Sequence, residues 1–248
     1  MTVRLTSAEV GRALRRSASR EKAAILSRFF KTGFGEYGAG DKFLGVVVPS
    51  QRRVARDFRD LPLTEIARLL KSPWHEERLT ALLILVDQHS RADDDLQKKL
   101  HRFYLAHGKY INNWDLVDLS AYFLVGPHVN PERPDLLERL ARSSNLWERR
   151  IAMVATFHFI KQGIPGPALF VAERLLNDRH DLIHKAVGWM LREVGKRCSV
   201  KAERGFLDRH AAVMPRTMLR YAIERFPAPL RAHYMRQNTL IVRREGVP

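Results

Sequence analysis

Glu77-Arg78-Leu79-Thr80-Ala81 is the first of three short stretches in which a cation precedes a run of small or apolar residues. Arg149-Arg150-Ile151-Ala152-Met153 and His184-Lys185-Ala186-Val187-Gly188 align with it without gaps. The alignment places Arg78, Arg150 and Lys185 in register, 72 and 35 residues apart, with Trp114 midway between the first two. A period of about 36 residues is typical of the two-helix repeats of an α-solenoid.

Apolar residues in the rest of the chain also recur every three or four positions, which predicts helices. Only Leu44 to Val48 has β-branched residues in a strand-like run. Start signals such as Pro49-Ser50 and breaks such as Gly126-Pro127 delimit the segments. We expect helices over 7–17, 20–31, 50–59, 63–71, 75–89, 93–107, 114–125, 133–142, 146–161, 166–176, 181–196, 200–212, 215–225 and 229–238.

These segments predict an all-α fold, a right-handed α-solenoid of about six or seven HEAT-like helical repeats. We expect a single curved domain over residues 1–240, with a glycine-rich insert at 33–45 and a basic C-terminal tail at 241–248. An irregular helical bundle whose spacing is accidental is the alternative.

The charge of the chain indicates a polyanionic partner. It holds 43 Lys and Arg against 27 Asp and Glu, a formal net charge of +16. Ribosomal, membrane-surface and DNA-binding proteins share such an excess. The single cysteine, Cys198, excludes an internal disulfide framework and a cysteine-cluster zinc site, and favours a cytoplasmic protein. No apolar run approaches the length of a membrane span. Residues 1–30 weakly resemble a transit peptide, but their helical periodicity favours a folded segment.

Aromatic and charged residues at helical spacing form the candidate site. Trp114 and Asp118 are four residues apart, as are Lys185 and Trp189, so each pair shares a helical face. Trp114 and Trp189 are suited to stacking on a nucleotide or to core packing. A carboxylate at Asp118, among apolar neighbours, is either paired with an arginine or used in chemistry. Arg150 is either that partner or a phosphate ligand.

Two further features have two interpretations each. The glycine-rich segment lacks the Gly-Lys-Ser/Thr ending of a phosphate-binding P-loop, so it is an ordered surface loop or a backbone nest near DNA phosphates. Arg52 and Arg53, and likewise Arg216 and Arg220, form clusters that bind phosphates or are simply solvated. Trp74 and Trp147 open helices and indicate scaffold positions.

The chain resembles the AlkD-type alkylpurine DNA glycosylases, which are built of HEAT-like repeats, from about Ala23 to Phe226. The motifs that carry the resemblance are Trp114-Asp115-Leu116-Val117-Asp118, Asn145-Leu146-Trp147-Glu148-Arg149-Arg150 and Lys185-Ala186-Val187-Gly188-Trp189-Met190-Leu191-Arg192-Glu193. In that family the residues that match Trp114, Asp118, Arg150 and Trp189 form the active site. The glycine-rich insert is the main departure from the family's pattern.

The resemblance implies a monofunctional N-glycosylase that removes 3-alkyladenine and 7-alkylguanine from duplex DNA without base flipping, and it implies no cofactor or metal. We expect DNA contacts from Arg78, Lys185, Arg149, Arg192, Arg52, Arg53, Arg216 and Arg220. We further expect a monomeric bacterial protein that works in the cytoplasm at the nucleoid. A catalytically silent binder of damaged or branched DNA would keep the arginines without needing Asp118, and a protein-binding scaffold would need neither.

Overall fold

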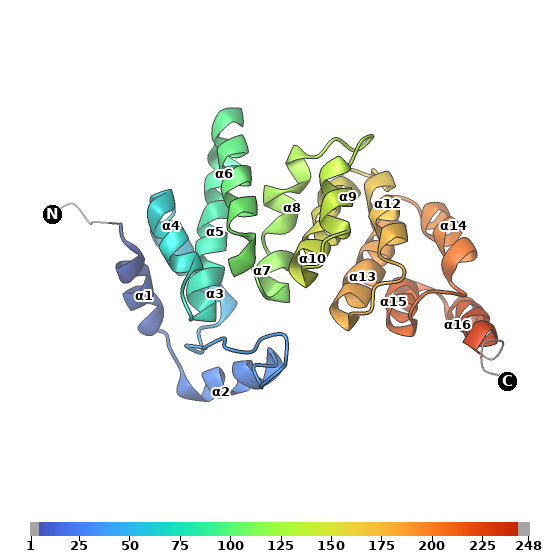
Figure 1. The fold of residues 1–248 in the computed structure, drawn as a ribbon, viewed down its shortest axis with the longest axis horizontal. Coiled ribbons are helices and arrows are strands. Elements are labelled where there is room, and N and C mark those ends of the chain that lie inside the picture. Colours follow the sequence, from blue (N-terminus) through green and yellow to red (C-terminus); the bar gives the residue numbers. More distant parts are fainter. Residues whose placement is uncertain (1–4, 243–248) are drawn as a thin grey trace. The chain divides into compact units, whose positions relative to one another are not determined.

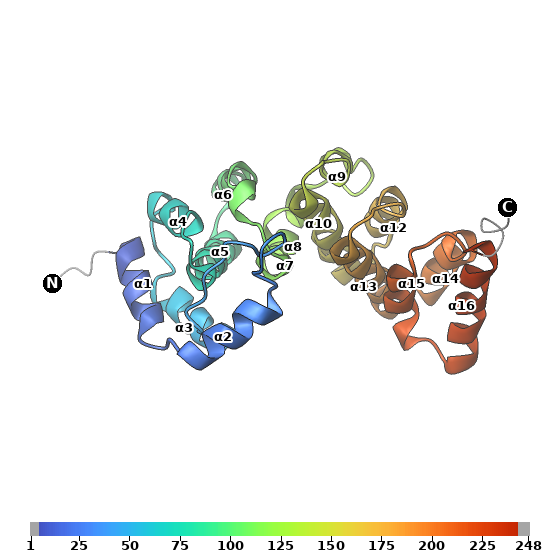
Figure 2. The same ribbon diagram turned by 60° about the horizontal axis from the view of Figure 1, so that its bottom comes forward.

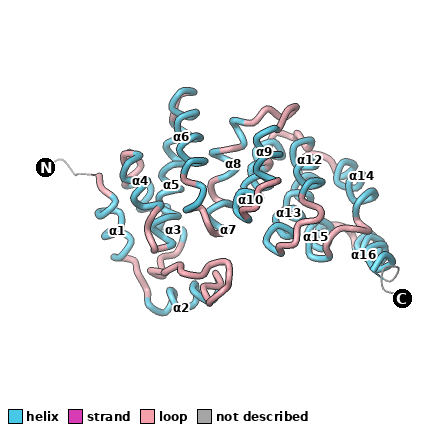
Figure 3. Tube along the Cα trace, in the orientation of Figure 1, coloured by secondary structure: helices cyan, strands magenta, loops and turns pink. Residues whose placement is uncertain are grey.

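The structure, a computed structural model, describes residues 5–242, with side chains through residue 237. The described residues form helices and loops, without a strand (Figure 3). One isolated backbone bridge joins Lys42 to Trp74. The prediction of an all-α fold is therefore confirmed. The chain divides into two compact units, residues 1–124 and 125–248. The single curved domain stays a prediction, and most of the expected basic tail lies outside the described residues.

The first unit is organised around one long, buried helix, α5 (Figure 1). Its helices are α1 (Ser7–Arg15), α2 (Arg20–Phe29), α3 (Val48–Asp57), α4 (Leu63–Leu70), α5 (His75–Arg91), α6 (Asp94–Ala106), α7 (Trp114–Asp118) and α8 (Ala121–Leu124). Every residue of α5 from His75 to Leu85 is buried, and α3, α4, α6, α7 and α8 all pack against it. In contrast, α2 buries none of its residues and stands apart from the paired helices of its unit (Figures 1 and 2).

The second unit has an equivalent centre in α13. Its helices are α9 (Asp135–Ala141), α10 (Leu146–Ala155), α11 (Phe157–Lys161), α12 (Gly166–Arg174), α13 (Asp181–Arg197), α14 (Val200–His210), α15 (Arg216–Ala222) and α16 (Ala228–Val242). Helices α10, α11, α12, α14 and α15 pack against α13. Most of the predicted helices lie where the sequence places them, because their apolar stripes become this core.

Two predicted helices are each broken in two. The hydroxyl of Ser120 donates to the carbonyl of Leu116 at 2.5 Å, where α7 ends and α8 has not begun. The hydroxyl of Thr156 donates to the carbonyl of Met153 at 2.6 Å, between α10 and α11. A side-chain hydroxyl that bonds a carbonyl of the preceding turn competes with the helical ladder, which accounts for both breaks.

The repeat register in the structure differs by one residue from the register that the sequence suggests. Arg78 donates to the carbonyl of Ser72, and Arg149 donates to the carbonyl of Ser143, in each case six residues back. His184 bonds the carbonyl of Asp178 in the same way. Arg78 therefore corresponds to Arg149 and not to Arg150. One residue is a rotation of about 100° around a helix, so Arg78 and Arg150 do not point in equivalent directions.

We predict that Gly188→Ala destabilises the second unit. A β-carbon on Gly188 of α13 would lie against the carbonyl oxygen of Met218 and 2.5 Å from the β-carbon of Tyr221. Both atoms belong to α15, so the two helices must separate, and we expect a loss of about 1–3 kcal/mol in the free energy of unfolding. Urea denaturation measures the loss.

Gly205→Ala in α14 is the matched control, because its β-carbon would meet nothing closer than the Arg209 guanidinium at 3.9 Å. That variant should be unchanged, or more stable by up to about 1 kcal/mol, since alanine favours a helix over glycine. Equal effects of the two substitutions would contradict the close approach of α13 and α15.

Candidate active site

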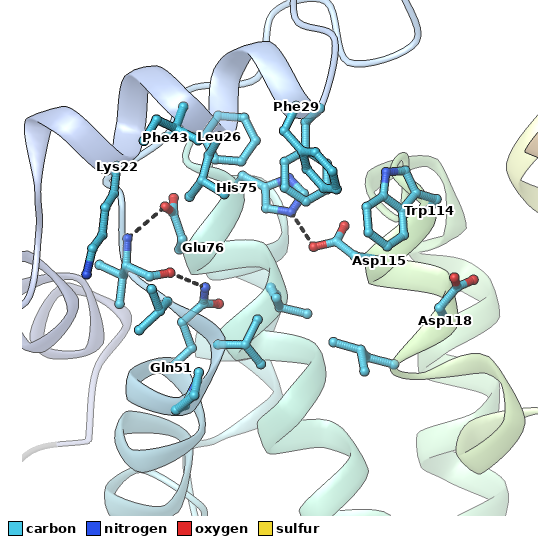
Figure 4. Close-up of a pocket in the computed structure, with 18 residues that line it drawn as sticks. Lys22, Leu26, Phe29, Phe43, Gln51, His75, Glu76, Trp114, Asp115 and Asp118 are labelled. Carbon is cyan, nitrogen blue, oxygen red and sulfur yellow. Dashed lines mark hydrogen bonds and ion pairs between the residues drawn. The ribbon is translucent and has the colours of Figure 1, made fainter.

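The short helix α7 carries the aromatic residue and the carboxylate of the first motif. Asn113 caps α7, and its side-chain oxygen accepts a hydrogen bond from the amide of Trp114 at 2.8 Å. Trp114 and Asp118 stand one turn apart, both half-buried, while Leu116 and Val117 between them are fully buried. The pair thus shares a helical face at the edge of the core, as the spacing predicts. Figure 4 shows both side chains on this helix.

The indole of Trp114 packs against two aromatic residues from the end of α2. The ring of Phe30 stacks on it at a centroid distance of 5.2 Å and an interplanar angle of 19°. Phe29 meets it edge-on at 5.8 Å. Phe30 also stacks on Phe43 at 5.2 Å. Such arrangements stabilise by about 0.5–1.5 kcal/mol per pair beyond burial, so they fix the orientation of the indole.

Beneath this stack, a buried histidine lies between two carboxylates. Nε2 of His75 is 2.8 Å from Asp115, and Nδ1 is 3.2 Å from Asp41. Burial alone would lower the pKa of His75, but the charge and hydrogen bond of Asp115, helped by the hydrogen bond of Asp41, raise it to about 9. His75 is therefore a buried cation at neutral pH.

Asp41 connects this histidine to two more segments. It accepts hydrogen bonds from His75 and from Asn113, and it pairs with Arg78 at 2.7 Å. Burial would raise the pKa of Asp41, but these donors and the charge of Arg78 outweigh burial and lower it. Through Asn113 and Asp115, which flank Trp114, the network holds the start of α7 in place.

The glycine-rich segment is therefore more than a surface loop. Its first part is exposed, but Asp41 and Phe43 are buried in the network and the aromatic stack. The amides of Leu44, Gly45 and Val46 form a nest, as one of the two sequence interpretations expects. The anion in that nest is the buried carboxylate of Glu76, however, at 2.8–3.2 Å, so these amides are not available to a DNA phosphate.

The second unit holds the other two predicted site residues. Arg150 of α10 is 5% exposed, and its guanidinium donates to the carbonyl of Leu182, the residue that follows the first residue of α13. Trp189 of α13 is half-buried, with its ring 6.1 Å from that of Phe157. Gly188 beside it lets α13 approach α15 closely. Convergence of Arg150 and Trp189 with Trp114 and Asp118 stays a prediction from the resemblance.

The expected DNA-contacting residues fall into two groups. Arg78 is 4% exposed in its pair with Asp41, and Arg149 binds Asp178 at 2.6 Å together with two loop carbonyls. A guanidinium so occupied stabilises the loop before its helix, and a phosphate contact from either residue stays a prediction. Arg192 pairs with Glu224 and is 20% exposed in its side chain. The exposed or partly exposed cations are Arg52, Arg53, Lys185, Arg216 and Arg220.

Sequence reasoning missed Asp41, His75 and Asp115 as parts of the site. Asp115 stands inside the quoted Trp114 motif, and His75 opens α5, whose residues from His75 to Leu85 are all buried, a position where an unpaired imidazole is costly. The sequence positions of Asp115 and His75 could therefore have indicated both residues as parts of the site. The pairing with Asp41 joins residues 34 positions apart in sequence, which no local pattern reveals.

Metal and membrane features are not found among the described residues. No group of three or more His, Cys, Asp or Glu side chains there could hold a metal ion. No helix in the same part of the chain combines the length and apolarity that a membrane span requires.

Comparisons with known proteins show the family through a family model and the fold through a solved structure. Residues 10–226 match the family model described as DNA alkylation repair enzyme. A solved structure described as a predicted DNA alkylation repair enzyme from Enterococcus faecalis superposes with a TM-score of 0.66 at 16% sequence identity. The match covers 86% of this chain and 98% of that one, and at this identity it concerns the fold. No curated protein sequence matches this chain significantly.

We predict that the charge of His75 makes stability depend on pH. The pKa of His75 is raised from 6.5 to about 9 in the folded protein, so protonated His75 stabilises fully below pH 6.5, and this contribution is lost as pH rises through about 9. Over that window the free energy of unfolding should fall by on the order of 2–3 kcal/mol more in the wild type than in His75→Gln.

Urea denaturation across this pH window measures the difference. His233→Gln, which replaces an exposed histidine, is the control and should follow the wild type. Parallel curves for the wild type and His75→Gln would mean that the imidazole is neutral in the folded protein.

Proposed function

We propose, since this chain belongs to the family of DNA alkylation repair enzymes, that it is a monofunctional DNA N-glycosylase. Its substrates would be cationic alkylated purines, 3-alkyladenine and 7-alkylguanine, in duplex DNA. The observation that carries the proposal is the placement of Trp114 and Asp118 one turn apart on a helix that buried charges hold in place. A protein that only binds DNA has no need of a carboxylate at Asp118 on a surface meant for phosphates.

The chemistry requires a single carboxylate. Alkylation at a ring nitrogen gives the purine a positive charge, so the bond between the purine nitrogen and C1′ breaks with both electrons leaving on the base, which departs neutral. Glycosidases that act on neutral leaving groups need a second carboxyl group to donate a proton. Here Asp118 would stabilise the oxocarbenium-like sugar and orient the water that adds to C1′, and the water proton passes to solvent.

The aromatic side chains and the cations would hold the DNA. Trp114 and Trp189 would pack against the deoxyribose, and Arg150 would bind the backbone phosphate beside it. The resemblance to the AlkD-type enzymes implies that the base does not have to leave the duplex, unlike in most glycosylases. Arg52, Arg53, Lys185, Arg216 and Arg220 would add phosphate contacts that carry no sequence information. We propose that the protein acts as a monomer on cytoplasmic DNA.

We predict that Asp118→Asn lowers excision without weakening DNA binding. The substitution keeps the shape of the side chain and removes its charge, so single-turnover release of 7-methylguanine from a duplex should fall roughly 10²–10³-fold. Affinity for undamaged duplex should stay the same or rise slightly, because a negative charge near phosphates is removed.

Asp95→Asn is the matched control, since Asp95 is an almost fully exposed carboxylate on α6. It should excise at the wild-type rate. Wild-type protein that binds duplex tightly but releases neither 7-methylguanine nor 3-methyladenine would replace the glycosylase proposal with that of a catalytically silent DNA binder.

We predict that DNA binding depends steeply on salt and that exposed arginines cause the dependence. Each phosphate contact contributes about −0.9 to the slope of log affinity against log salt concentration. The slope measured for the double variant Arg216→Ala/Arg220→Ala should therefore be shallower than the wild-type slope by about 1.8. Fluorescence anisotropy with a labelled duplex measures the slope.

The double variant Arg133→Ala/Arg142→Ala removes two exposed arginines that we do not assign to DNA, and it serves as the control for net charge. If both double variants changed the slope equally, the contacts would be spread over the whole surface and not concentrated at Arg216 and Arg220.

A further inference from the structure

The loop of residues 31–40 holds the side chain of Phe34 fully in solvent. Among the described residues, the next most exposed large apolar side chain is that of Phe29, at 61%. The loop directly follows α2, which Figure 1 shows apart from the paired helices of its unit. Burial of a fully exposed phenyl ring is favourable wherever a partner offers a surface, so Phe34 is a candidate contact residue.

Hydrogen bonds fix the backbone on both sides of Phe34. The amide of Gly38 donates to the carbonyl of Lys31 at 3.1 Å, which closes the loop. The amide of Gly33 donates to the carboxylate of Glu36 at 2.9 Å, and the amide of Glu36 donates to the carbonyl of Gly33 at 3.1 Å. The exposure of Phe34 is therefore a property of the folded loop, and the ring is presented before any partner binds.

The loop lies close to the candidate site. It begins directly after Phe30, whose ring stacks on Trp114 at 5.2 Å. Its far end leads to Phe43, whose ring stacks on Phe30 at 5.2 Å. Phe34 follows Phe30 by four residues, and four residues span at most about 14 Å, the length of about four base steps. Phe34 can therefore contact a duplex within a few base steps of a nucleotide held at Trp114.

The exposed ring stands among cations that have no acidic partner. None of the five cations on α2 and in the segment after it forms an ion pair with a described residue. Of the three acidic residues in the same segment, Asp41 is already paired with Arg78. Aromatic rings among free cations are typical of surfaces that bind nucleic acid, where cations contact phosphates and rings stack on bases. The five cations are Arg20, Lys22, Arg28, Lys31 and Lys42.

A bilayer surface is the other partner that basic segments with apolar residues bind. Such binding requires a continuous apolar face on the helix. The apolar stripe of α2, formed by Ile25, Leu26 and Phe29, instead lines an apolar cavity that α2 shares with α3, α5 and α7 (Figure 4). Phe34 is left as a single projecting ring, and a duplex offers a place for a single ring between two stacked base pairs.

We infer that Phe34 inserts between two stacked base pairs beside the lesion and kinks the duplex there, an inference that rests on the proposed action on duplex DNA. Apolar side chains that enter a base step in this way partly unstack it and kink the duplex by about 20–90°. The bases of such a step stay paired, so the insertion does not require base flipping. As a positioning residue, Phe34 would hold the duplex in one register relative to Asp118.

The fluorescence of 2-aminopurine tests the insertion, because stacking quenches this base and unstacking restores its emission. Each duplex of a series carries a tetrahydrofuran abasic analogue at its centre, which resembles the product of the proposed reaction and cannot be excised. The series places 2-aminopurine in turn at each position within five base steps of the analogue. With the full chain at saturation, emission should rise about threefold at one position, as partial unstacking of one step implies.

Two variants of Phe34 separate insertion from electrostatic binding. Phe34→Ala should show no rise in emission, whereas Phe34→Leu, which keeps an apolar side chain, should show most of it. Phe34→Ala should also bind the duplex about tenfold more weakly, because the contribution of one stacked ring is lost. The salt slope of its affinity should equal that of the wild type, since Phe34 carries no charge. Both variants should fold normally, because the side chain is fully exposed.

Val213→Ala is the matched control, since it removes a 56% exposed apolar side chain between α14 and α15 and should behave like the wild type. Wild-type protein that binds the duplex without raising emission at any position, or a rise that persists in Phe34→Ala, would overturn the inference. Phe34-dependent binding to vesicles of anionic phospholipid, with DNA binding unchanged in Phe34→Ala, would assign the ring to a membrane surface instead.

The result also distinguishes this inference from the proposed activity. A rise in emission without release of 7-methylguanine would retain the insertion of Phe34 and contradict the glycosylase proposal. Release of 7-methylguanine without a rise in emission would retain the activity and contradict the insertion.

Discussion

A cationic histidine enclosed between two carboxylates is the interaction on which the first unit depends. His75 lies 2.8 Å from Asp115 and 3.2 Å from Asp41, and all three side chains are at most 10% exposed. Charges buried to this degree are stable only when each is paired, and removing one partner from such a set typically costs about 3–5 kcal/mol. The network therefore admits one arrangement of the segments that contribute to it: the glycine-rich segment, the start of α5 and the start of α7.

This constraint explains how so short a helix can present a site. Helix α7 has five residues, far fewer than an isolated helix needs to be stable in water. Its first turn is tied to Asp41 through Asn113 and to His75 through Asp115. Tyr104 and Ser120 bond each other just beyond its end. Trp114 and Asp118 thus project from a rigid base, which is the preorganisation that a catalytic carboxylate requires.

The helices, and the face shared by Trp114 and Asp118, could be predicted from the sequence, because each depends on local periodicity. The register of the repeats could not be fixed to one residue. Arg149 and Arg150 are adjacent cations, and either aligns with Arg78 over an apolar run. A hydrogen bond distinguishes the two arginines. Arg149 donates to the carbonyl six residues before it, and Arg78 makes the same bond in its own repeat.

The role of the glycine-rich segment could not be predicted either. Its composition is that of a loop, and much of it is one. The burial of Asp41 depends on His75 and Arg78, which lie more than 30 residues away in the chain. A charge in a loop reveals nothing about a distant partner, whereas apolar periodicity reveals a helical face directly. Local periodicity therefore reveals the helical face that Trp114 and Asp118 share, but it does not reveal the distant residues that hold α7 in place.

In the proposed reaction one carboxylate suffices, because the leaving base already carries a positive charge. The decisive measurement compares the release of free base from two matched duplexes. One duplex contains 7-methylguanine, which is cationic, and the other contains hypoxanthine, which is neutral. We expect release of 7-methylguanine and none of hypoxanthine under the same conditions. Comparable release of both bases would contradict it, since a neutral leaving group requires a general acid that Asp118, acting as a carboxylate, does not supply.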